Sequence, residues 1–452
     1  MMKQHQPTPN PTSAEAVAFE GAETGHISLG YGSKNYSFRY DPQRFEVVAP
    51  HDAATEASSD AALDAALSNP INSRPLEEIV DPTDKVVIVV PDATRAAGVE
   101  RIVSLYYRRL TRHGLANNQI SLLIGGGIHR PPTPAEIQTI AGAEVAQNLA
   151  VHPHDANDYS MLATVGKTRR GTPIELNRRL LEVDRVLVVG GITFHYFAGF
   201  SGGRKAILPG CASERAIQAN HLLSFDVERM DKRIGVASGL LDGNAVHEDM
   251  EEAVGMLEPS FLVNTVLNAR NEINAVYAGD WRAAHRRGCE EYSASHSVEV
   301  TAKRPLVVVS VGGAPRDINL IQSHKAMEHA SGLLEEGGTM IVLAECAQGL
   351  GRDDFLRWFV AGGSRATAEM LLQDYKINGQ TAWGLRRKAE RFRLLLVSAL
   401  APDVVRLMGL EPHTSLESAM AEVSAVEPGY IMPGGLTTLP RLNNFHPQAV
   451  AA

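Results

Sequence analysis

The sequence RVLVVGGITFHYFAGFSGGRK, residues 185–205, decides the fold of this chain. Residues 186–189 are an apolar run that predicts a buried strand. Glycines end it, and a loop with His195 and Lys205 leads to a helical pattern at 213–223. A strand, a glycine-rich loop and a helix form the unit of an α/β sheet, whose ligands bind beyond the carboxyl ends of the strands. A merely solvated loop is the alternative, but functional residues concentrate on such loops.

The same alternation extends in both directions. Strands are predicted at 85–90, 120–124 and 150–151, and helices at 99–113, 134–140 and 176–181. A hairpin at 27–40 and a short helix at 61–67 precede them, and a hairpin at 261–278 and a polar helix at 281–293 follow. A second unit begins with a strand at 306–311 and continues with strands at 340–344 and 394–398 and helices at 320–334, 354–360, 366–375 and 383–392.

These patterns predict an α/β protein in which two α/β domains with mostly parallel sheets flank a central cleft. We expect residues 1–20 to be a disordered tail and residues 21–290 to form an N-terminal catalytic and cofactor-binding domain. Residues 303–425 are expected to form the C-terminal domain and to contribute substrate-binding residues. Residues 430–452 are expected to return to the first domain.

Composition narrows the class of protein. The chain is 44% hydrophobic and 21% charged, with a net charge of −9, which is typical of an ordinary enzyme and disfavours binding to nucleic acid or a membrane surface. Three distant cysteines and the lack of a secretory or membrane-spanning apolar run indicate a cytoplasmic protein.

Two polar clusters follow the first two strands of the alternation. Asp92, Thr94 and Arg95 follow the strand at 85–90; the arginine fork can grip a carboxylate or phosphate, although a capped helix start would look the same. His129 follows three glycines at 125–127, where a backbone can approach a ligand and an imidazole can exchange protons. The alternative there is a structural turn with an exposed histidine.

The opening stretch and the second unit supply two more clusters. Backbone N–H groups at 201–203 can receive an anion beside Lys205, but the spacing is not that of a nucleotide-triphosphate loop. His221 lies on the following helix, where a histidine is more often structural than a metal ligand. Gln322 and Lys325 can reach an anionic substrate across a cleft, or can lie on a solvated helix face.

Two other functions remain open from the residues alone. A zinc-dependent hydrolase or lyase acting on a small carboxylate would use His152, His154 and Asp155 to hold the metal. A non-catalytic protein that binds small carboxylates would need the cations but not paired bases.

In combination, the motifs resemble those of the nickel-dependent lactate racemase family over essentially the whole chain. The resemblance rests on PDATR at 91–95, GGGIH at 125–129, HYFAGFSGGRKAILPG at 195–210 and QSHKAME at 322–328. It implies a racemase or epimerase that inverts C2 of a 2-hydroxy acid by hydride transfer to and from a nickel pincer nucleotide, pyridinium-3,5-bisthiocarboxylic acid mononucleotide nickel. Accessory cofactor-biosynthesis proteins would supply that cofactor.

The resemblance also assigns roles to residues. His129 and His195 match the two acid–base histidines, Lys205 the cofactor tether and His221 the nickel ligand. Arg95, Gln322 and Lys325 match residues that bind the substrate. The other positions expected near the cofactor are Asp92, Thr94, Arg95, Ser201, Gly202, Gly203 and Trp383.

The expected chemistry explains the two bases. A hydride leaves C2 more easily when a base takes the hydroxyl proton, and each enantiomer needs a base on its own side. Ile321 departs from the tyrosine expected beside Gln322 in a lactate enzyme. The reaction type therefore follows from the motifs, whereas the identity of the 2-hydroxy acid and the oligomeric state do not.

Overall fold

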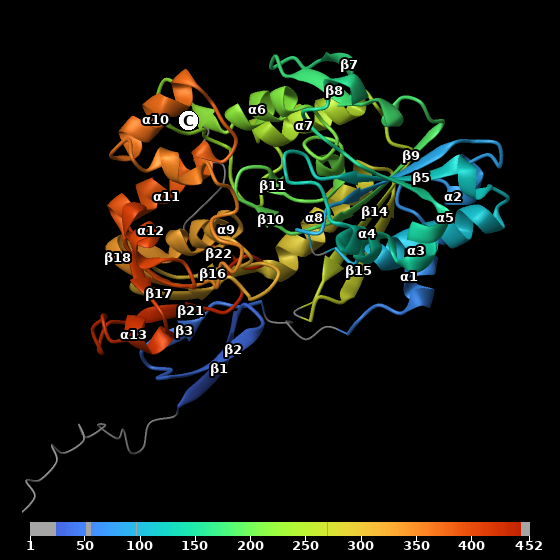
Figure 1. Cartoon of the computed structure of the whole chain (residues 1–452). Helices are drawn as coiled ribbons and strands as arrows, with labels where there is room; N and C mark the ends of the chain where they lie inside the picture. The colour runs from blue at the N-terminus through green and yellow to red at the C-terminus, as the bar shows by residue number, and fades with distance from the viewer. Residues whose placement is uncertain (1–23, 51–55, 96, 269, 444–452) are drawn as a thin grey trace, which may run out of the picture.

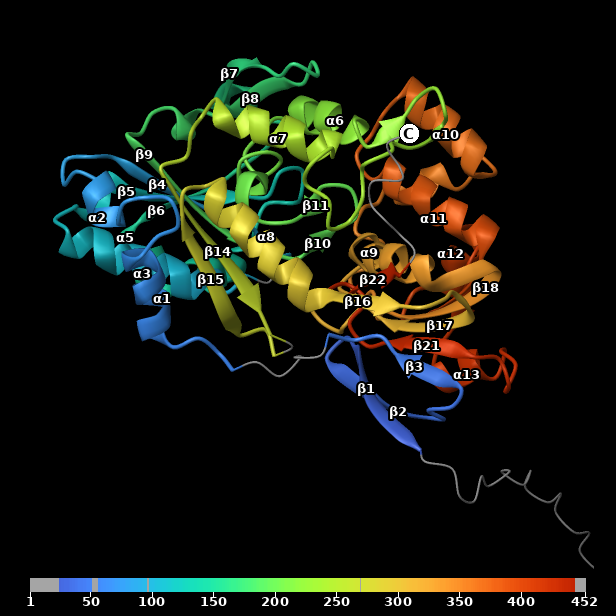
Figure 2. The same ribbon diagram turned by 180° about the vertical axis from the view of Figure 1, so that it is seen from behind.

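The computed structural model describes residues 24–50, 56–95, 97–268 and 270–443, and the tail expected at 1–20 lies outside these ranges. Two six-stranded sheets lie on opposite sides of the molecule (Figures 1 and 2). The first has the order β15-β14-β9-β4-β5-β6, and all its neighbours are parallel except β14 and β15. Its strands are β4 (Val86–Pro91), β5 (Ile120–Gly125), β6 (Ala150–Pro153), β9 (Arg185–Gly191), β14 (Phe261–Leu267) and β15 (Ile273–Gly279).

Both faces of the first sheet are covered by helices. Along β4, Val87 and Val89 point into one apolar core while Ile88 and Val90 point into the other, because side chains alternate along a strand. This double burial explains the continuous apolar runs from which the strands were predicted. One face carries α1 (Asp60–Ser68), α2 (Leu76–Ile79), α3 (Val99–Arg112), α4 (Pro134–Ala141) and α5 (Ala143–Asn148); the other carries α6 (Glu214–Leu222), α7 (Ala245–Gly255) and α8 (Ala283–His296).

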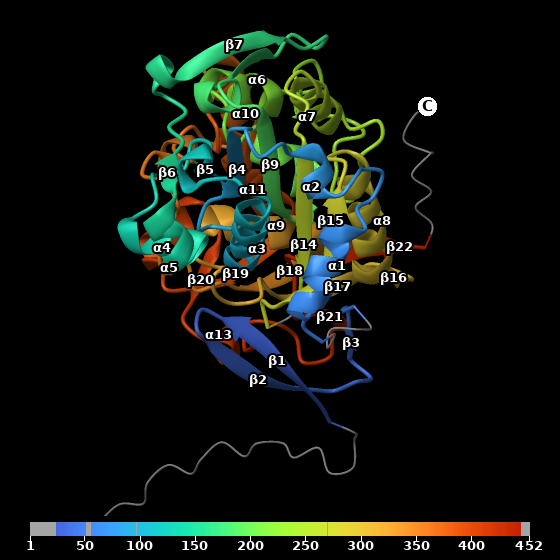
Figure 3. The ribbon, with the colours of Figure 1, turned by 90° about the vertical axis from the view of Figure 1, so that its right-hand side faces the viewer.

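The second sheet is parallel throughout, with the order β20-β19-β18-β17-β21-β3. Its strands are β3 (Phe45–Val47), β17 (Arg304–Ser310), β18 (Leu334–Leu343), β19 (Arg393–Val397), β20 (Glu411–His413) and β21 (Gly429–Met432). One face packs against α9 (Leu320–Ala330), α10 (Ser364–Gln373), α11 (Gly379–Arg391) and α12 (Pro402–Leu407). The other packs against α13 (Leu416–Met420) and the hairpin of β1 (Gly25–Tyr31) and β2 (Lys34–Tyr40), which lies beneath the sheet in Figure 3.

The α/β fold class is confirmed, but both ends of the chain lie elsewhere than expected. The hairpin β1–β2 and strand β3 belong with the second sheet, although residues 21–290 were expected to form one domain. Residues 429–432 also join the second sheet, and β22 (Leu439–Leu442) pairs with β16 (Ser297–Val300). Of this tail, Leu439 packs against the first core. Strand β21 pairs with the edge of β17, and β3 then pairs with β21. These pairings join segments far apart in the sequence, so no local sequence pattern predicts them.

Two short segments also differ from the predicted helices. Residues 173–177 form strand β8 (Pro173–Asn177), which pairs antiparallel with β7 (Leu162–Lys167), and only a 3₁₀ turn follows at Arg178–Leu180. Residues 355–358 form a 3₁₀ turn instead of the helix expected at 354–360. Paired ribbons complete the fold: β10 (Phe194–His195) with β11 (Gly199–Phe200), and β12 (Phe225–Asp226) with β13 (Asp231–Lys232).

The carboxyl ends of β4, β5 and β9 face the second unit. Loops from these ends and helix α9 from the second unit therefore enclose the same space (Figure 1). Among the described residues, no helix has both the length and the apolar character required to cross a membrane.

Candidate functional site

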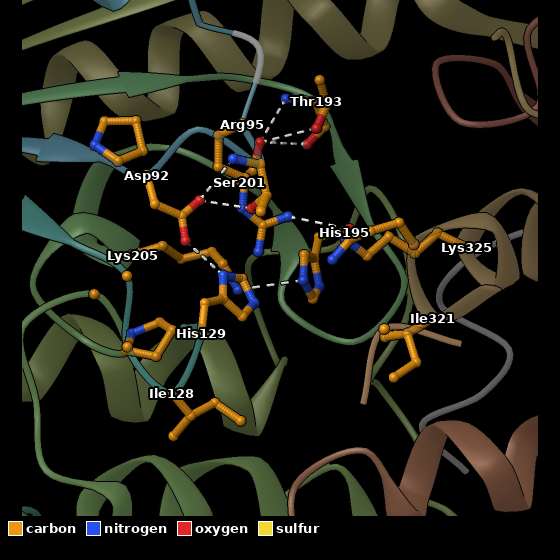
Figure 4. Close-up of a pocket in the computed structure, with 18 of the residues that line it drawn as sticks. Asp92, Arg95, Ile128, His129, Thr193, His195, Ser201, Lys205, Ile321 and Lys325 are labelled. Atoms are coloured by element: carbon orange, nitrogen blue, oxygen red, sulfur yellow. Dashed lines mark hydrogen bonds and ion pairs between the residues drawn. The ribbon is translucent and has the colours of Figure 1, made fainter. Parts of the chain in front are cut away.

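A cavity of about 1010 Å³ lies between the two units. Most of the polar residues singled out in the sequence line it: Asp92, Thr94, Arg95, His129, His195, Ser201, Gly202, Lys205, His221, Gln322 and Lys325. Figure 4 shows several of them pointing into one space from different elements. Separate segments of the sequence thus contribute to a single site, as expected for the carboxyl edge of a parallel sheet.

His129 is oriented by a buried carboxylate. Its Nδ1 lies 2.6 Å from Oδ2 of Asp92, and because a carboxylate only accepts, Nδ1 carries the proton. The other oxygen of Asp92 accepts from the backbone and the hydroxyl of Thr94, at 3.0 and 2.6 Å. Burial raises the pKa of Asp92, but the hydrogen bond and charge of His129 outweigh it, so that this pKa falls to about 2. Nε2 of His129 is therefore the ring nitrogen available to a ligand.

His195 lies at the opposite side of the same space, on β10. Its Nδ1 accepts a hydrogen bond from the N–H of Ala198 at 3.3 Å, and its Nε2 lies 3.3 Å from Nζ of Lys205. Burial and then the nearby cations, Lys205 first, hold its pKa well below the usual value for histidine. At neutral pH the ring is uncharged, which is the form that a general base requires.

Lys205 follows the glycine loop on a 3₁₀ turn at Gly203–Ala206. Burial, followed by the charges of Arg204, Arg95 and Lys325, holds the pKa of its amine well below the usual lysine value. The amine also lies over the ring of Phe197, 5.4 Å from its centroid. An uncharged lysine amine is a nucleophile, so this side chain can form a covalent bond with a ligand.

The loop at 201–203 is only in part the anion cradle that the sequence suggested. Gly202 and Gly203 have φ of 73° and 53°, and a Cβ at either position would lie within 2.6 Å of Asn264 or His285. The N–H of Ser201 donates to Thr193, and that of Gly203 donates to Asn264. Gly203 does not line the cavity. An anion here would depend mainly on side-chain cations, because two of the three N–H groups already have partners.

His221 enters the cavity from α6. The ring is 9% exposed, its Nδ1 is buried without a well-aligned hydrogen bond, and Phe197 packs against it at 4.8 Å. Burial and the charge of Lys205 lower its pKa to about 3, although the backbone of Ile217 acts in the opposite direction. A neutral imidazole facing a cavity is the form that binds a metal ion.

The second unit contributes cations through α9. Oε1 of Gln322 accepts from Nζ of Lys325 and lies 3.5 Å from Nη1 of Arg95, so one amide joins cations from both units. Burial and then the charge of Arg95 hold the pKa of Lys325 well below its usual value. Two basic side chains that share one amide are suited to an anionic ligand, whose charge would favour the protonated form of Lys325.

The structure does not bring Trp383 to the cavity. It is 5% exposed in the second core, where its ring meets Phe225 at 5.1 Å and Arg387 stacks over it. Phe225 lies four residues after His221, so Trp383 is linked to the site through that ribbon, and Gln380 and Thr381 of its own helix line the cavity.

The alternative zinc residues do not form a site. His154 is buried, and its ring nitrogens contact the carbonyl of Ala212 at 3.0 Å and the amide of Asn177 at 3.1 Å, which gives it a structural role. Within the described ranges, no group of three or more His, Cys, Asp and Glu side chains has a metal-binding arrangement.

Sequence reasoning missed several contributors. Tyr196 joins the units through a 3.0 Å hydrogen bond with Thr381, and Ile128 lines the cavity beside His129. Arg204 adjoins Lys205 in the sequence, yet it is buried and only Lys205 reaches the cavity. The five apolar or glycine residues before Ser201 predict burial of the loop, which is the one sequence signal for a buried arginine.

Comparison with known proteins identifies relatives. The family model for the lactate racemase N-terminal domain matches residues 31–232, and that for the lactate racemase C-terminal domain matches residues 300–429. The lactate racemase of Thermoanaerobacterium thermosaccharolyticum is 32% identical over 74% of this chain and 78% of its own length. That of Lactiplantibacillus plantarum is 30% identical over 89% of this chain and 95% of its own length.

A solved structure has the same fold. The lactate racemase apoprotein from T. thermosaccharolyticum superposes with a TM-score of 0.84 at 28% sequence identity, covering 92% of this chain and all of that chain (100%).

Proposed function

The chain belongs to the lactate racemase family and is a racemase, an isomerase, and from this premise we propose that it inverts C2 of lactate or a related 2-hydroxy acid with a nickel pincer nucleotide as cofactor. One observation carries the proposal: His129 and His195 line one cavity together with the cations Arg95 and Lys325 and the amine of Lys205. Binding a carboxylate needs only the cations. An inversion also needs two groups that exchange protons, and His129, bonded to Asp92, and His195 can serve as these groups.

The residues present fit such a cofactor. Lys205 offers an amine that loses its proton more readily than an ordinary lysine, which favours a covalent tether, and His221 offers a neutral ring to nickel. Among the described residues, no group of three or more His, Cys, Asp and Glu side chains could hold a metal ion. The organic part of the cofactor would therefore have to supply most of the nickel ligands. The cavity of about 1010 Å³ has room for a mononucleotide and a small acid together. When bound, the cofactor would supply an electrophilic carbon that takes the C2 hydrogen with its electron pair and returns it.

The chain's own residues hold the substrate and move its proton. Arg95 and Lys325 hold the carboxylate, and Gln322 keeps the two cations in register. Nε2 of His129 takes the hydroxyl proton of one enantiomer, while Asp92 stabilises the charge that forms on the ring. His195 takes the hydroxyl proton of the other enantiomer from the opposite side, for which its ring must adopt the tautomer with the proton on Nδ1 and a free Nε2, giving up the hydrogen bond from Ala198. In each inversion one histidine takes the proton and the other, already protonated, returns one, so the two rings exchange protonation states; a proton then passes between them through water, and none is consumed overall.

Other assignments follow from this proposal. Asp92, Thr94, Ser201 and Gly202 shape the wall beside the cofactor, and accessory proteins must deliver it. The partner is a small 2-hydroxy acid, with no role for nucleic acid or membrane. The zinc hydrolase alternative has no support, because His154 is engaged in the core.

The test is reconstitution with the cofactor-biosynthesis proteins. We expect about one nickel per chain, a mass added at Lys205, and interconversion of the enantiomers of a 2-hydroxy acid. A substrate labelled with deuterium at C2 should keep its label during inversion. Loss of the label to water would instead indicate proton abstraction from carbon and contradict the hydride scheme.

A further inference from the structure

Arg204 is a fully buried arginine directly behind the site. Its side chain is 1% exposed, and its Nη2 donates to the carbonyl of Ala198 at 2.6 Å. Its Nη1 donates to the carbonyl of Phe200 at 3.0 Å and lies 3.5 Å from that of Gly202. One guanidinium thus binds alternate carbonyls of the loop that runs from His195 to Lys205, and fixes its shape.

His285 of α8 holds the other side of this loop. Its Nε2 lies 3.1 Å from Nη1 of Arg204 and 3.0 Å from the carbonyl of Ser201. A Cβ on Gly203 would lie 2.6 Å from the His285 ring, so the loop packs directly against it. The loop is therefore held by a side chain of its own and by a ring from the neighbouring helix.

The charge of Arg204 is not neutralised by an ion pair with any described residue. Burial is the main effect on its pKa, which falls to about 10, while the nearby Cys289 and Glu251 act in the opposite direction. A buried positive charge one residue from Lys205 opposes a second positive charge on that amine.

The hydrogen bonds around His195 lead independently to the same state of Lys205. Nδ1 of His195 accepts from a backbone N–H, so in the neutral ring the proton is on Nε2. Nε2 then donates toward Nζ of Lys205, 3.3 Å away, and the amine must accept. Only an uncharged amine has the lone pair to do so.

We propose that Arg204 is the positioning residue of this site: it fixes the loop that presents His195 and Lys205, and it primes the Lys205 amine for covalent attachment. This inference rests on the proposed function only for the identity of the group attached. The priming itself is a property of the protein without cofactor.

The experiment uses cofactor-free protein and acetic anhydride as an acyl probe, from pH 6 to pH 10. The lone pair of Nζ forms a C–N bond to one acetyl carbon, acetate leaves with the bonding electrons, and the nitrogen loses a proton to water. Peptide mass spectrometry gives the labelled fraction of Lys205 relative to the exposed Lys303 of the same molecules. In the native protein we expect half-maximal labelling of Lys205 at a lower pH than that of Lys303.

Two variants separate charge from geometry. Arg204→Gln should move half-maximal labelling of Lys205 up by about one pH unit or more, which is a tenfold loss of relative labelling below that pH. Arg204→Lys keeps a charge but cannot span the carbonyls, so it should keep the low labelling pH while the loaded enzyme loses at least about tenfold in kcat with little change in KM. Circular dichroism and thermal melting check that each variant is folded.

Two results would overturn the inference. One is a folded Arg204→Gln protein with unchanged relative labelling. The other, which needs no variant, is a native protein in which Lys205 and Lys303 label with the same pH dependence. Failure to find nickel would leave both measurements intact, because neither uses the cofactor.

Discussion

The carboxylate of Asp92 and the imidazole of His129 form a 2.6 Å hydrogen bond between the ends of adjacent parallel strands. Asp92 is 6% exposed, and its second oxygen is bound by Thr94. The pair therefore fixes both the tautomer and the direction of the ring. In the proposed reaction it also stabilises the imidazolium that forms when His129 takes a proton.

Asp92→Asn should lower kcat by roughly 10²–10⁴-fold, since the amide can stabilise the wrong tautomer and cannot balance the charge. Chiral assay of both directions measures the loss. Asp403→Asn, at a side chain that is 99% exposed, is the matched control and should be neutral. Activity of Asp92→Asn within a factor of three of the native protein would contradict the role of this pair.

The same pair predicts a pH dependence of stability. The pKa of Asp92 is about 2 in the folded protein and 3.8 in the unfolded chain, so its stabilising effect is complete above about pH 4 and is lost as the pH falls toward 2. This difference in pKa corresponds to about 2 kcal/mol in the free energy of unfolding at neutral pH. Thermal melting of native protein and Asp92→Asn should show a constant gap from pH 7 to pH 5 that narrows toward pH 3. A gap that widens on acidification would reverse the sign of this coupling.

The strands that carry the site could be predicted because they are buried on both faces. In β4 and β9 nearly every residue is apolar, and the polar clusters begin where the apolar run stops. The segment at 176–181 was predicted wrongly as a helix, because its pairing partner β7 supplies the order and a five-residue strand has too little local signal. The places of β1, β2 and β21 depend on contacts hundreds of residues away.

Some residues of the site could likewise be predicted from the sequence, and others could not. His129, His195 and Lys205 follow strands directly, so their meeting in one cavity was predictable from parallel-sheet geometry. The roles of Lys205 and His221 came from resemblance to a family, because the residues alone suggested only a cation and a helix histidine. Arg204 and the contact of Trp383 with Phe225 depend on tertiary packing and have no periodicity or spacing that reveals them.

If His129 and His195 are the two bases, removing either one should slow turnover of both enantiomers. His129→Ala and His195→Ala should each reduce turnover of both enantiomers by roughly 10²-fold or more, because every inversion uses one histidine to take the proton and the other to return it. Progress curves from each pure enantiomer provide the measurement, with the exposed His26→Ala as control. The ratio of kcat/KM in the two directions is fixed by the equilibrium constant, so a variant cannot lower kcat/KM in one direction alone. Near-normal rates in both directions for either variant would therefore contradict the two-base scheme.

Ile321 and Ile128 predict the preference for substrate size. They line the cavity on either side of the two histidines, where the substituent on C2 would extend (Figure 4). Ile321→Tyr adds volume there and should lower kcat/KM for acids with longer aliphatic chains by about 10-fold or more relative to lactate. A panel of 2-hydroxy acids measures this ratio, and Val360→Tyr, at an exposed position, controls for surface effects. An unchanged ratio would place the substituent elsewhere.

Trp383 predicts a link between the two units. Its ring packs on Phe225, and the same ribbon is held to the second unit by ion pairs from Asp231 to Arg387 and from Lys232 to Glu328. Because this ribbon directly follows the helix of His221, loosening it should shift the imidazole relative to Lys205. Trp383→Ala should therefore cost about 3–5 kcal/mol of stability and also reduce the nickel retained after gel filtration.

Arg387→Ala separates the two effects of that change. It removes a partly buried ion pair and the guanidinium stacked over Trp383 but leaves the packing of Trp383 on Phe225, so stability should fall by only about 1 kcal/mol. If the ring contact positions His221, nickel retention in Arg387→Ala should stay near that of the native protein. Equal loss of nickel in both variants would show that the ribbon as a whole, and not the packing of Phe225 on Trp383, holds His221, the proposed nickel ligand, in place.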